Sequence, residues 1–314
     1  MADPGDGRMR LAILGGFLGS GKTTWLRHQL HRGAWDDMHL IVNEAAETPV
    51  DDALLGTGGD LTLLAGGCCC CVGRDALLAA LGGLADRRSR GERLDRIILE
   101  TSGLADPGAI IAAIQGHPVL IHHVLVEEVT VAVDALHALA QLRTEPLGRR
   151  QIAAADRLVL TKTDEAGPAE LGRLVATLRL LNPEAEVSAA VRGEAVPLPD
   201  TSRAEPEALP ELAGEGEPLR PARVALGPDI DWTAFALWLS ALLHARGDEL
   251  VRVKGVVPTP AGRLLLQTVR KVVQQPEILP EQADRHDDGT VVFIGRGFRP
   301  DDLRRSLRRF TGQA

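Results

Sequence analysis

From Gly16 to Thr24 the chain runs Gly-Phe-Leu-Gly-Ser-Gly-Lys-Thr-Thr, and this stretch decides the fold because it matches the phosphate-binding loop G-x-x-x-x-G-K-[ST]. Its glycines allow backbone N–H groups to turn toward a phosphate chain. Lys22 is expected to contact the outer phosphates, and the hydroxyl of Thr23 is a suitable ligand for Mg²⁺. The predicted nucleotide-binding residues of the loop are Gly16, Gly19, Ser20, Gly21, Lys22, Thr23 and Thr24.

The neighbouring sequence predicts the strand and the helix that such a loop requires. Residues 11–14 are a short apolar run typical of a buried strand, and residues 23–32 have the pattern of a helix. The amino end of this helix adds partial positive charge to the phosphate site. Further apolar strands at 39–42, 96–99 and 157–160 alternate with helical segments. The predicted fold class is α/β, a P-loop NTPase domain with a mostly parallel, doubly wound sheet.

Changes in composition predict how the chain is divided. Residues 1–8 are expected to be a disordered tail and residues 9–191 the domain that carries the phosphate-binding loop, in which 119–126 is rich in β-forming residues. Residues 192–222 are rich in Pro, Glu and Ala and are predicted to be a linker. Residues 223–314 carry both helical and strand patterns, which predicts a smaller α+β domain.

The overall composition argues against two classes of protein. The formal net charge of −8 argues against a nucleic-acid-binding protein. No apolar run approaches the roughly 20 residues that span a bilayer, so no association with a membrane is expected. We therefore expect a cytoplasmic protein, in a compartment where nucleotides and reduced thiols are available.

All four cysteines are consecutive, from Cys68 to Cys71, so separate disulfides cannot form a framework. Alternate side chains of an extended segment share a face, so Cys68 and Cys70 are expected to point together, and Cys71 joins them if the chain turns. Three thiolates suit a soft or borderline cation, with Zn²⁺ as the default. A fourth position is left for Glu44, a histidine, water or a partner. The alternatives are a redox-active pair of neighbouring thiols and buried, inert cysteines.

Two further segments follow predicted strands and complete a GTP site. Glu100 begins Glu-Thr-Ser-Gly, in which its carboxylate is placed to hold Mg²⁺ or its water, and the N–H of Gly103 to sense a γ-phosphate. Thr161 begins Thr-Lys-Thr-Asp, in which Asp164 can accept hydrogen bonds from N1–H and the exocyclic amine of guanine. Adenine does not offer these donors, so GTP is expected rather than ATP. The stem of Lys162 is expected to lie along the base.

A third segment begins with Asn43 and Glu44, directly after the strand predicted at 39–42. The carboxyl ends of parallel strands line the ligand crevice of such sheets, so we expect both side chains near the phosphates. Glu44 is our hypothesis for the residue that positions the attacking water. The predicted catalytic residues are Lys22, Glu100 and Glu44.

These motifs together resemble the CobW-like GTPases, metal-handling proteins of the same P-loop class as the nickel-insertion GTPases of urease and hydrogenase. The most specific of them is the Gly-Cys-Cys-Cys-Cys run at 67–71, which fits the family's G-C-x-C-C. The resemblance covers nearly the whole chain apart from residues 192–222. The segments that carry it are 15–24, 43–44, 67–71, 100–107, 155–157, 161–164, 250–255 and 292–295.

The resemblance implies GTP hydrolysis coupled to metal delivery, with Zn²⁺ or Co²⁺ as the cargo. It places Lys22 on the phosphates and makes Cys69 the variable position of the cysteine motif. The ligands that it implies are Thr23 and Glu100 for Mg²⁺, and Cys68, Cys70 and Cys71 for the transition metal.

The chain departs from the family pattern in two places. The base motif begins with Thr161 where Asn is commoner, and a hydroxyl can still bond the loop or the base. After Asn43-Glu44 the chain has Ala45, Ala46 and Pro49, where such proteins often have aromatic residues and glycine. Pro49 restricts this segment and therefore its response to nucleotide.

The predicted function is a GTP-dependent metallochaperone that delivers zinc, or alternatively cobalt, to an apo-metalloprotein client. Slow GTP turnover is expected without a partner, and a homodimer is one assembly that the sequence allows. A metal-sensing regulatory GTPase that transfers no metal is the first alternative. The second is a P-loop enzyme that uses ATP and holds a structural zinc, against which Asp164 argues.

Overall fold

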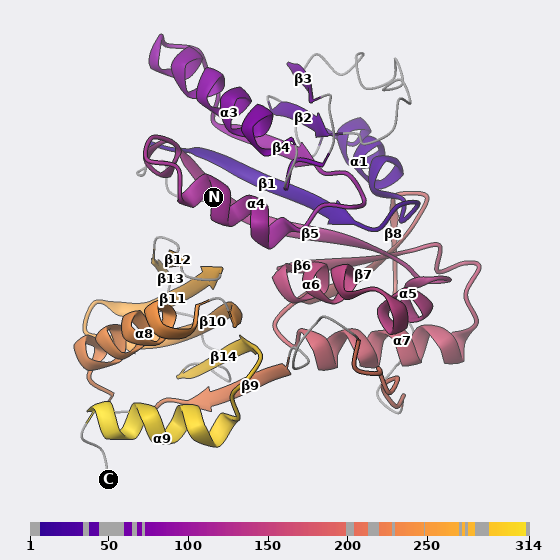
Figure 1. The fold of residues 1–314 in the computed structure, drawn as a ribbon. Helices are drawn as coiled ribbons and strands as arrows, with labels where there is room; N and C mark the ends of the chain where they lie inside the picture. Colours follow the sequence, from indigo (N-terminus) through magenta and orange to yellow (C-terminus); the bar gives the residue numbers. More distant parts are fainter. Residues whose placement is uncertain are drawn as a thin grey trace. The chain divides into compact units, whose positions relative to one another are not determined.

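The computed structural model of the chain describes residues 7–33, 38–43, 60–64, 68–70, 73–198, 204–212, 220–227, 230–247, 249–269, 272–273, 276–279 and 289–311 (Figure 1). It divides into two compact units. The first comprises Met1–Arg179 and Ala185–Leu209, and the second comprises Leu180–Glu184 and Pro210–Ala314. None of the helices in the described ranges is long and apolar enough to cross a membrane.

The first unit is built on an 8-stranded sheet with the strand order β3-β2-β4-β1-β5-β6-β7-β8. Its strands pair in parallel, except that the short strand β8 runs antiparallel to β7. The five neighbouring strands β2, β4, β1, β5 and β6 carry mostly apolar residues, as expected for a parallel sheet that helices cover on both faces. The strands are β1 (Met9–Gly16), β2 (His39–Asn43), β3 (Leu61–Leu64), β4 (Arg96–Glu100), β5 (Val124–Asp134), β6 (Arg157–Thr161), β7 (Glu186–Val191) and β8 (Glu194–Val196).

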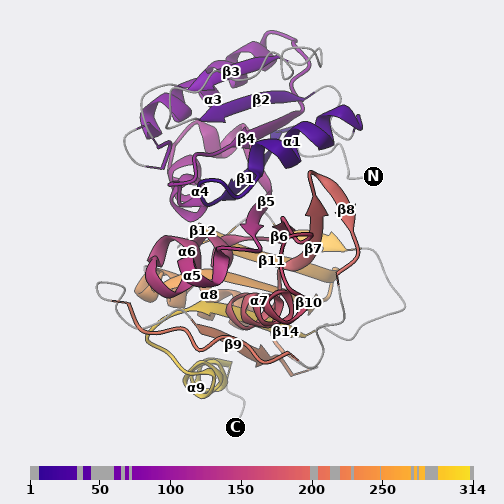
Figure 2. The same cartoon turned by 90° about the vertical axis from the view of Figure 1, so that its right-hand side faces the viewer.

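Helices cover both faces of this sheet, which confirms the predicted doubly wound α/β class. Helix α1 buries Trp25 and Leu26 against one face, in a cluster with Leu14 of β1 and Ile98 of β4. Figure 2 shows α1 on one side of β1 and α4 on the other. The helices of the first unit are α1 (Lys22–His31), α3 (Arg74–Ser89), α4 (Pro107–Gln115), α5 (Ala138–Thr144), α6 (Pro146–Ala154) and α7 (Pro168–Leu181).

The stretch 119–126 was expected to be β-rich, and for its first half this prediction is wrong. Leu120–His122 forms a short 3₁₀ helix, η2, and strand β5 begins only at Val124. The ring nitrogen Nδ1 of His117 accepts hydrogen bonds from the N–H groups of residues 119 and 120, at 3.3 Å each. These local bonds occupy backbone donors that a strand would need, and they outweigh the β-propensity of the valine and isoleucine side chains.

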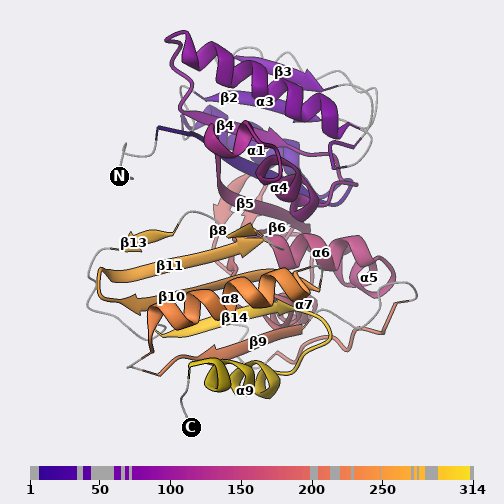
Figure 3. The same cartoon turned by 60° about the vertical axis from the view of Figure 1, so that its left-hand side comes forward.

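The second unit contains a 6-stranded antiparallel sheet, in which five strands follow the order β12-β11-β10-β14-β9 and β13 pairs with β11. Helices α8 and α9 pack on the same face of this sheet (Figure 3). Strand β8 and the start of β9 lie within residues 192–222. The elements of this unit are β9 (Arg220–Ala225), α8 (Trp232–Arg246), β10 (Leu250–Thr259), β11 (Gly262–Val269), β12 (Val272–Val273), β13 (Glu277–Leu279), β14 (Thr290–Gly295) and α9 (Pro300–Thr311).

Scarce aromatic residues are concentrated in the core of the second unit. Trp238 of α8 packs edge-on against Phe293 of β14, with ring centroids 5.8 Å apart, and Phe235 lies one helical turn away from Trp238. The indole N–H of Trp238 donates to Ser306 Oγ of α9 at 3.0 Å, which ties the two helices together. Asp231 caps α8 by accepting hydrogen bonds from the N–H groups of Thr233 and Ala234.

The parallel arrangement brings several strand ends to one edge of the first sheet. Strand β1 ends at Gly16, β2 at Asn43, β4 at Glu100 and β6 at Thr161. Leu14 of β1 and Val42 of β2 both align with Glu100 in the sheet register. The polar segments that follow these strands therefore meet at the carboxyl edge, where ligands bind in open α/β sheets.

Candidate functional site

The phosphate-binding loop connects β1 to α1, and its lysine is held against the loop backbone. Gly21 caps α1 in the left-handed conformation, with φ of 80°, and Lys22 is the first residue of the helix. The ammonium Nζ donates to the carbonyl oxygens of Gly16 at 3.0 Å and of Phe17 at 2.8 Å. The lysine side chain is buried, so its charge stays close to the N–H groups at the amino end of α1.

Gly16 shows why the loop needs glycine where β1 ends. Its φ of +135° is in a region that side chains disfavour, and a Cβ there would lie 2.4 Å from the carbonyl oxygen of Ala132. The same Cβ would meet the hydroxyl of Ser20 at 2.8 Å. In the described part of the chain this buried Ser20 hydroxyl has no hydrogen-bond partner. The loop thus contains a polar group that is placed to bond a ligand.

Thr23 and Glu100 come together beside the loop, from the first turn of α1 and the end of β4. The Thr23 hydroxyl donates to Glu100 Oε1 at 2.5 Å, and the carboxylate is only 3% exposed. A hydroxyl and a carboxylate are hard oxygen ligands of the kind that Mg²⁺ prefers. The buried Ser20 hydroxyl lies in the same loop, so the donor set fits Mg²⁺ bound with a nucleotide.

The segment after β4 touches the phosphate-binding loop directly. A Cβ on Gly103 would lie 2.3 Å from the backbone nitrogen of Leu18 and 2.7 Å from its Cα, so only glycine allows this approach. Gln151 of α6 holds the segment from the other side. Its Nε2 donates to the carbonyl oxygens of Ala105 at 2.8 Å and of Gly103 at 3.4 Å, and the whole side chain is buried. The sequence reasoning missed Gln151, because a lone glutamine in a helix carries no motif.

Gly103→Ala is expected to lower kcat/KM for GTP hydrolysis by about 10²-fold, because its Cβ must displace either the loop at Leu18 or the 100–103 segment by a substantial fraction of an ångström. Steady-state phosphate release measures the effect. Gly83→Ala is the control, because Gly83 lies within α3 with open space around it. The control should keep full activity and raise the free energy of unfolding by about 0.5–1 kcal/mol. Equal activities of the two variants would contradict the close contact at Leu18.

Strand β6 bonds the phosphate-binding loop through its last residue, Thr161. The hydroxyl of Thr161 donates to the carbonyl oxygen of Ser20 at 2.8 Å. Of the two partners considered for the Thr161 hydroxyl, the loop and the base, the structure shows a bond to the loop. Lys162, with φ of 55°, turns its ammonium to Asp134 at the end of β5, where Nζ and Oδ2 are 2.6 Å apart. Asp164 is exposed at the same edge of the sheet and has no ion pair within the described ranges.

Asp134 is a site residue that the motif search did not predict, although its place at a strand end could have suggested it. Burial alone raises the pKa of its carboxyl, but hydrogen bonds from Lys162, His137 and the N–H of Leu136 outweigh burial and hold the pKa below its usual value. The lowered pKa shows that the folded protein stabilises the ionised carboxylate. This carboxylate fixes the position of the Lys162 ammonium group at the carboxyl edge of the sheet.

Asp134→Asn is expected to lower the free energy of unfolding by about 1–3 kcal/mol near neutral pH, because two charged hydrogen bonds are weakened. A carboxyl with a lowered folded-state pKa stabilises the fold above its unfolded pKa, about 4, and loses this effect as the pH falls through its folded value. The difference between wild type and variant should therefore shrink below about pH 4. Denaturant titrations across the acid range measure it, with exposed Glu165→Gln as the control. If the difference in unfolding free energy did not depend on pH, it would not come from the charge of the Asp134 carboxylate.

Two of the three predicted ligand sulfurs lie close together in the described structure. Cys68 Sγ and Cys70 Sγ are 2.8 Å apart and partly exposed, whereas Cys69 between them is fully buried. The two sulfurs lie together as expected, but Cys69 and Cys70 form a turn instead of the expected extended segment. The N–H of Gly73 donates to the carbonyl oxygen of Cys68 at 2.9 Å. Cys71 and Glu44, the other residues predicted for metal binding and catalysis, lie outside the described residues. Within the described ranges, no group of three metal-binding side chains is found.

Hydrogen bonds join the cysteine segment to the end of β2 and to the segment that follows β4. The N–H of Cys69 donates to Asn43 Oδ1 at 2.9 Å, and Asn43 is buried. The thiol of Cys70 faces the carbonyl oxygen of Leu104 at 3.9 Å, one residue after Gly103. Asn43 was predicted near the phosphates, and the structure places its side chain on the cysteines. One of these two segments therefore contacts the backbone of the cysteine segment, and the other faces the thiol of Cys70, a predicted metal ligand.

Comparisons with known families match both parts of the chain. Residues 10–189 match the model described as "CobW/HypB/UreG, nucleotide-binding domain". Residues 223–311 match the "Cobalamin synthesis protein cobW C-terminal domain". The two matches follow one another along the chain in the order that the sequence motifs suggest.

Individual proteins with similar sequence or structure carry related names. The chain is 32% identical over 308 residues to "Zinc chaperone YjiA" of Escherichia coli, which covers 94% of this chain and 96% of that protein. It is 30% identical to "Zinc chaperone CobW" of Pseudomonas aeruginosa, over 92% of this chain and 88% of that one. The crystal structure of Zn(II)-bound YjiA GTPase from E. coli matches with a TM-score of 0.67 and 28% identity, covering 96% of this chain and 99% of YjiA.

Proposed function

This chain belongs to the CobW/HypB/UreG family of nucleotide-binding proteins, and from that premise we propose that it is a GTP-hydrolysing zinc chaperone. GTP is its substrate and zinc its cargo, with cobalt as the alternative cargo. Cys68, Cys70 and Cys71 hold the metal, and an apo-metalloprotein client receives it. This function accounts for both unusual features of the chain, the phosphate-binding loop and the run of cysteines.

In this proposal the loop residues bind the triphosphate. Lys22 leaves the carbonyl oxygens that it now contacts and places its charge on the outer phosphates. The N–H of Gly103 bonds the γ-phosphate, which is why the close approach to Leu18 matters. Thr23 and Glu100 would hold Mg²⁺, which neutralises charge on the phosphates when bound. Glu44 remains our hypothesis for the residue that orients the attacking water.

The observation that carries the proposal is the pair of contacts between the cysteine segment and the nucleotide edge. Asn43 accepts from the N–H of Cys69, and the Leu104 carbonyl faces the thiol of Cys70. A nucleotide that shifts Asn43 would therefore move the backbone of the cysteine segment, and one that shifts residues 100–104 would move the carbonyl that faces the Cys70 thiol. A coupling of this kind makes zinc affinity depend on the nucleotide, and by reciprocity makes nucleotide affinity depend on zinc.

The experiment is an equilibrium competition for zinc against a chromophoric chelator, with Mg²⁺ and a non-hydrolysable GTP analogue, with GDP, or with neither. Zinc affinity should differ by about fivefold or more between the two nucleotide states. Zinc transfer to an apo-client during GTP turnover then separates a chaperone from a metal sensor. Equal zinc affinity in all three states would sink the coupling, and coupling without transfer would favour the sensor.

Asp164→Ala is expected to weaken GDP binding by about 10²-fold and leave the weak binding of ADP nearly unchanged, because only guanine presents two donors to this carboxylate. Titration with fluorescent GDP and ADP analogues measures both constants. Glu165→Ala, which removes a neighbouring exposed carboxylate, should change neither. An unaltered preference for GDP in the Asp164 variant would place guanine recognition elsewhere and strengthen the case for an ATP-using enzyme.

A further inference from the structure

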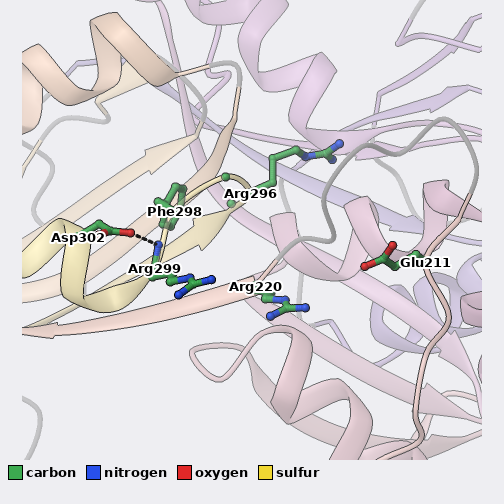
Figure 4. Close-up of a pocket in the computed structure, with 8 residues that line it drawn as sticks. Glu211, Arg220, Arg296, Phe298, Arg299 and Asp302 are labelled. Carbon is green, nitrogen blue, oxygen red and sulfur yellow. Dashed lines mark hydrogen bonds between the residues drawn. The ribbon is translucent and has the colours of Figure 1, made fainter.

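The second unit contains a pocket of about 340 Å³ at the start of β9 and the end of β14. Figure 4 shows the residues that line it, which come from the ends of these two strands, the loop before α9, the first turn of α9 and the segment that precedes β9. Phe298 supplies an aromatic face. The pocket is lined by Glu211, Arg220, Gly295, Arg296, Gly297, Phe298, Arg299 and Asp302.

Guanidinium groups dominate the charge of this pocket. Arg220 and Arg299 form no ion pair with any carboxylate in the described part of the chain. The carboxylate of Asp302 accepts from the backbone N–H of Arg299 at 3.3 Å, and its ion pair is with Arg305 of α9, at 3.9 Å. Figure 4 shows the Arg220 and Arg299 side chains extending toward the same side, with Glu211 facing them. Two neighbouring cations of this kind attract an anionic group that can accept paired hydrogen bonds.

We propose that this pocket, which we call the Arg220–Arg299 pocket, binds a carboxylate-bearing segment of a partner protein. Arginine and aromatic side chains in a small depression are the composition of interface hot spots. A cofactor pocket of this size would be lined mostly by apolar side chains, which this one is not. Glu211 and Asp302 can accept hydrogen bonds from the backbone N–H groups of a peptide, which a polyphosphate lacks.

The identity of the partner as the zinc-receiving client rests on the proposed function, whereas the carboxylate site itself does not. Peptide binding can be measured on the full chain without nucleotide or zinc. Its failure would leave the zinc–GTP coupling untouched, and failure of that coupling would leave peptide binding untouched. The two proposals are therefore tested separately.

The probes are three fluorescent hexapeptides, measured by anisotropy at low and high salt. Hexaglutamate with blocked ends carries side-chain carboxylates, and hexaglutamine with blocked ends is its neutral counterpart. A glycine–serine hexapeptide with a free carboxyl end carries only the terminal carboxylate. Hexaglutamate should bind at least about tenfold more tightly than hexaglutamine. Tight binding of the glycine–serine peptide alone would instead identify a partner's chain terminus as the carboxylate source.

Matched variants test the location of the site. Arg220→Gln with Arg299→Gln should weaken binding by at least about tenfold, and each single change should weaken it by a smaller factor. Arg308→Gln with Arg309→Gln removes the same charge from exposed positions of α9 outside the pocket, and should leave binding within about twofold. Thermal melting confirms that each variant folds.

Three results would overturn the proposal. The first is that neither hexaglutamate nor the free-carboxyl peptide binds more tightly than hexaglutamine. The second is that the α9 variant loses as much affinity as the pocket variant, which would show a general effect of charge. The third is displacement of hexaglutamate by pyrophosphate at far lower concentrations than by acetate, which would identify a phosphate ligand.

Discussion

Lys22→Ala is expected to lower kcat/KM for GTP hydrolysis by about three orders of magnitude or more. The lysine is buried at the start of α1, with its ammonium enclosed by the carbonyl oxygens of Gly16 and Phe17. In a site with little water, a charge facing developing negative charge on the phosphates is worth far more than on the surface. Alanine removes this charge and also leaves the two carbonyl oxygens without their donor.

The measurement is single-turnover GTP hydrolysis together with nucleotide affinity, which separates a loss of chemistry from a loss of binding. Arg32→Ala is the matched control, because it removes one positive charge from the exposed carboxyl end of the same helix. The control should stay within about twofold of wild type. An Lys22 variant that retained more than about a tenth of wild-type kcat/KM would contradict the assigned role.

The double change Cys68→Ser with Cys70→Ser is expected to weaken zinc binding by about 10³-fold or more. The two sulfurs lie 2.8 Å apart in the described structure, and serine hydroxyls are poor ligands for zinc at neutral pH. Competition with a chelator of known affinity measures the loss. GTP hydrolysis in the absence of zinc should be nearly unchanged, because the described contacts of the two thiols are with each other and with the Leu104 carbonyl, and neither thiol is among the predicted nucleotide ligands.

Cys69→Ser provides the control within the same run of cysteines. Its side chain is fully buried, and its N–H rather than its thiol bonds Asn43. Zinc affinity should remain within about threefold of wild type, while the buried hydroxyl lowers the free energy of unfolding by about 1–3 kcal/mol. A loss of zinc affinity equal to that of the double variant would show that Cys69 is itself a ligand.

The fold and the nucleotide edge were predictable because each motif follows an apolar strand. Parallel pairing then forces Gly16, Glu100 and Thr161 to one edge, whatever the detailed packing. The turn at Leu120–His122 was not predictable from propensity, because it depends on where the His117 ring nitrogen lies relative to two N–H groups. A contact set by side-chain direction leaves no periodic signal in the sequence.

The contacts between the motifs could not be predicted from the sequence either. Thr161 was expected to bond the loop or the base, and only the tertiary structure shows its hydroxyl on Ser20. Lys162 was expected along the base, whereas its ammonium pairs with Asp134, a residue of no motif. Asn43 meets Cys69 across 26 positions of the chain. Distances of this kind depend on how β2 and the cysteine segment pack, which no local pattern encodes.

Gln151 restrains the segment after β4. Its amide holds the carbonyl oxygens of Gly103 and Ala105, on either side of Leu104. These two bonds restrain the stretch from Gly103 to Ala105 against α6. The Leu104 carbonyl that faces Cys70 lies within this stretch, only one residue from the contact of Gly103 with the phosphate-binding loop. So short a connection would link the nucleotide site to the cysteine segment without any large rearrangement of the domain.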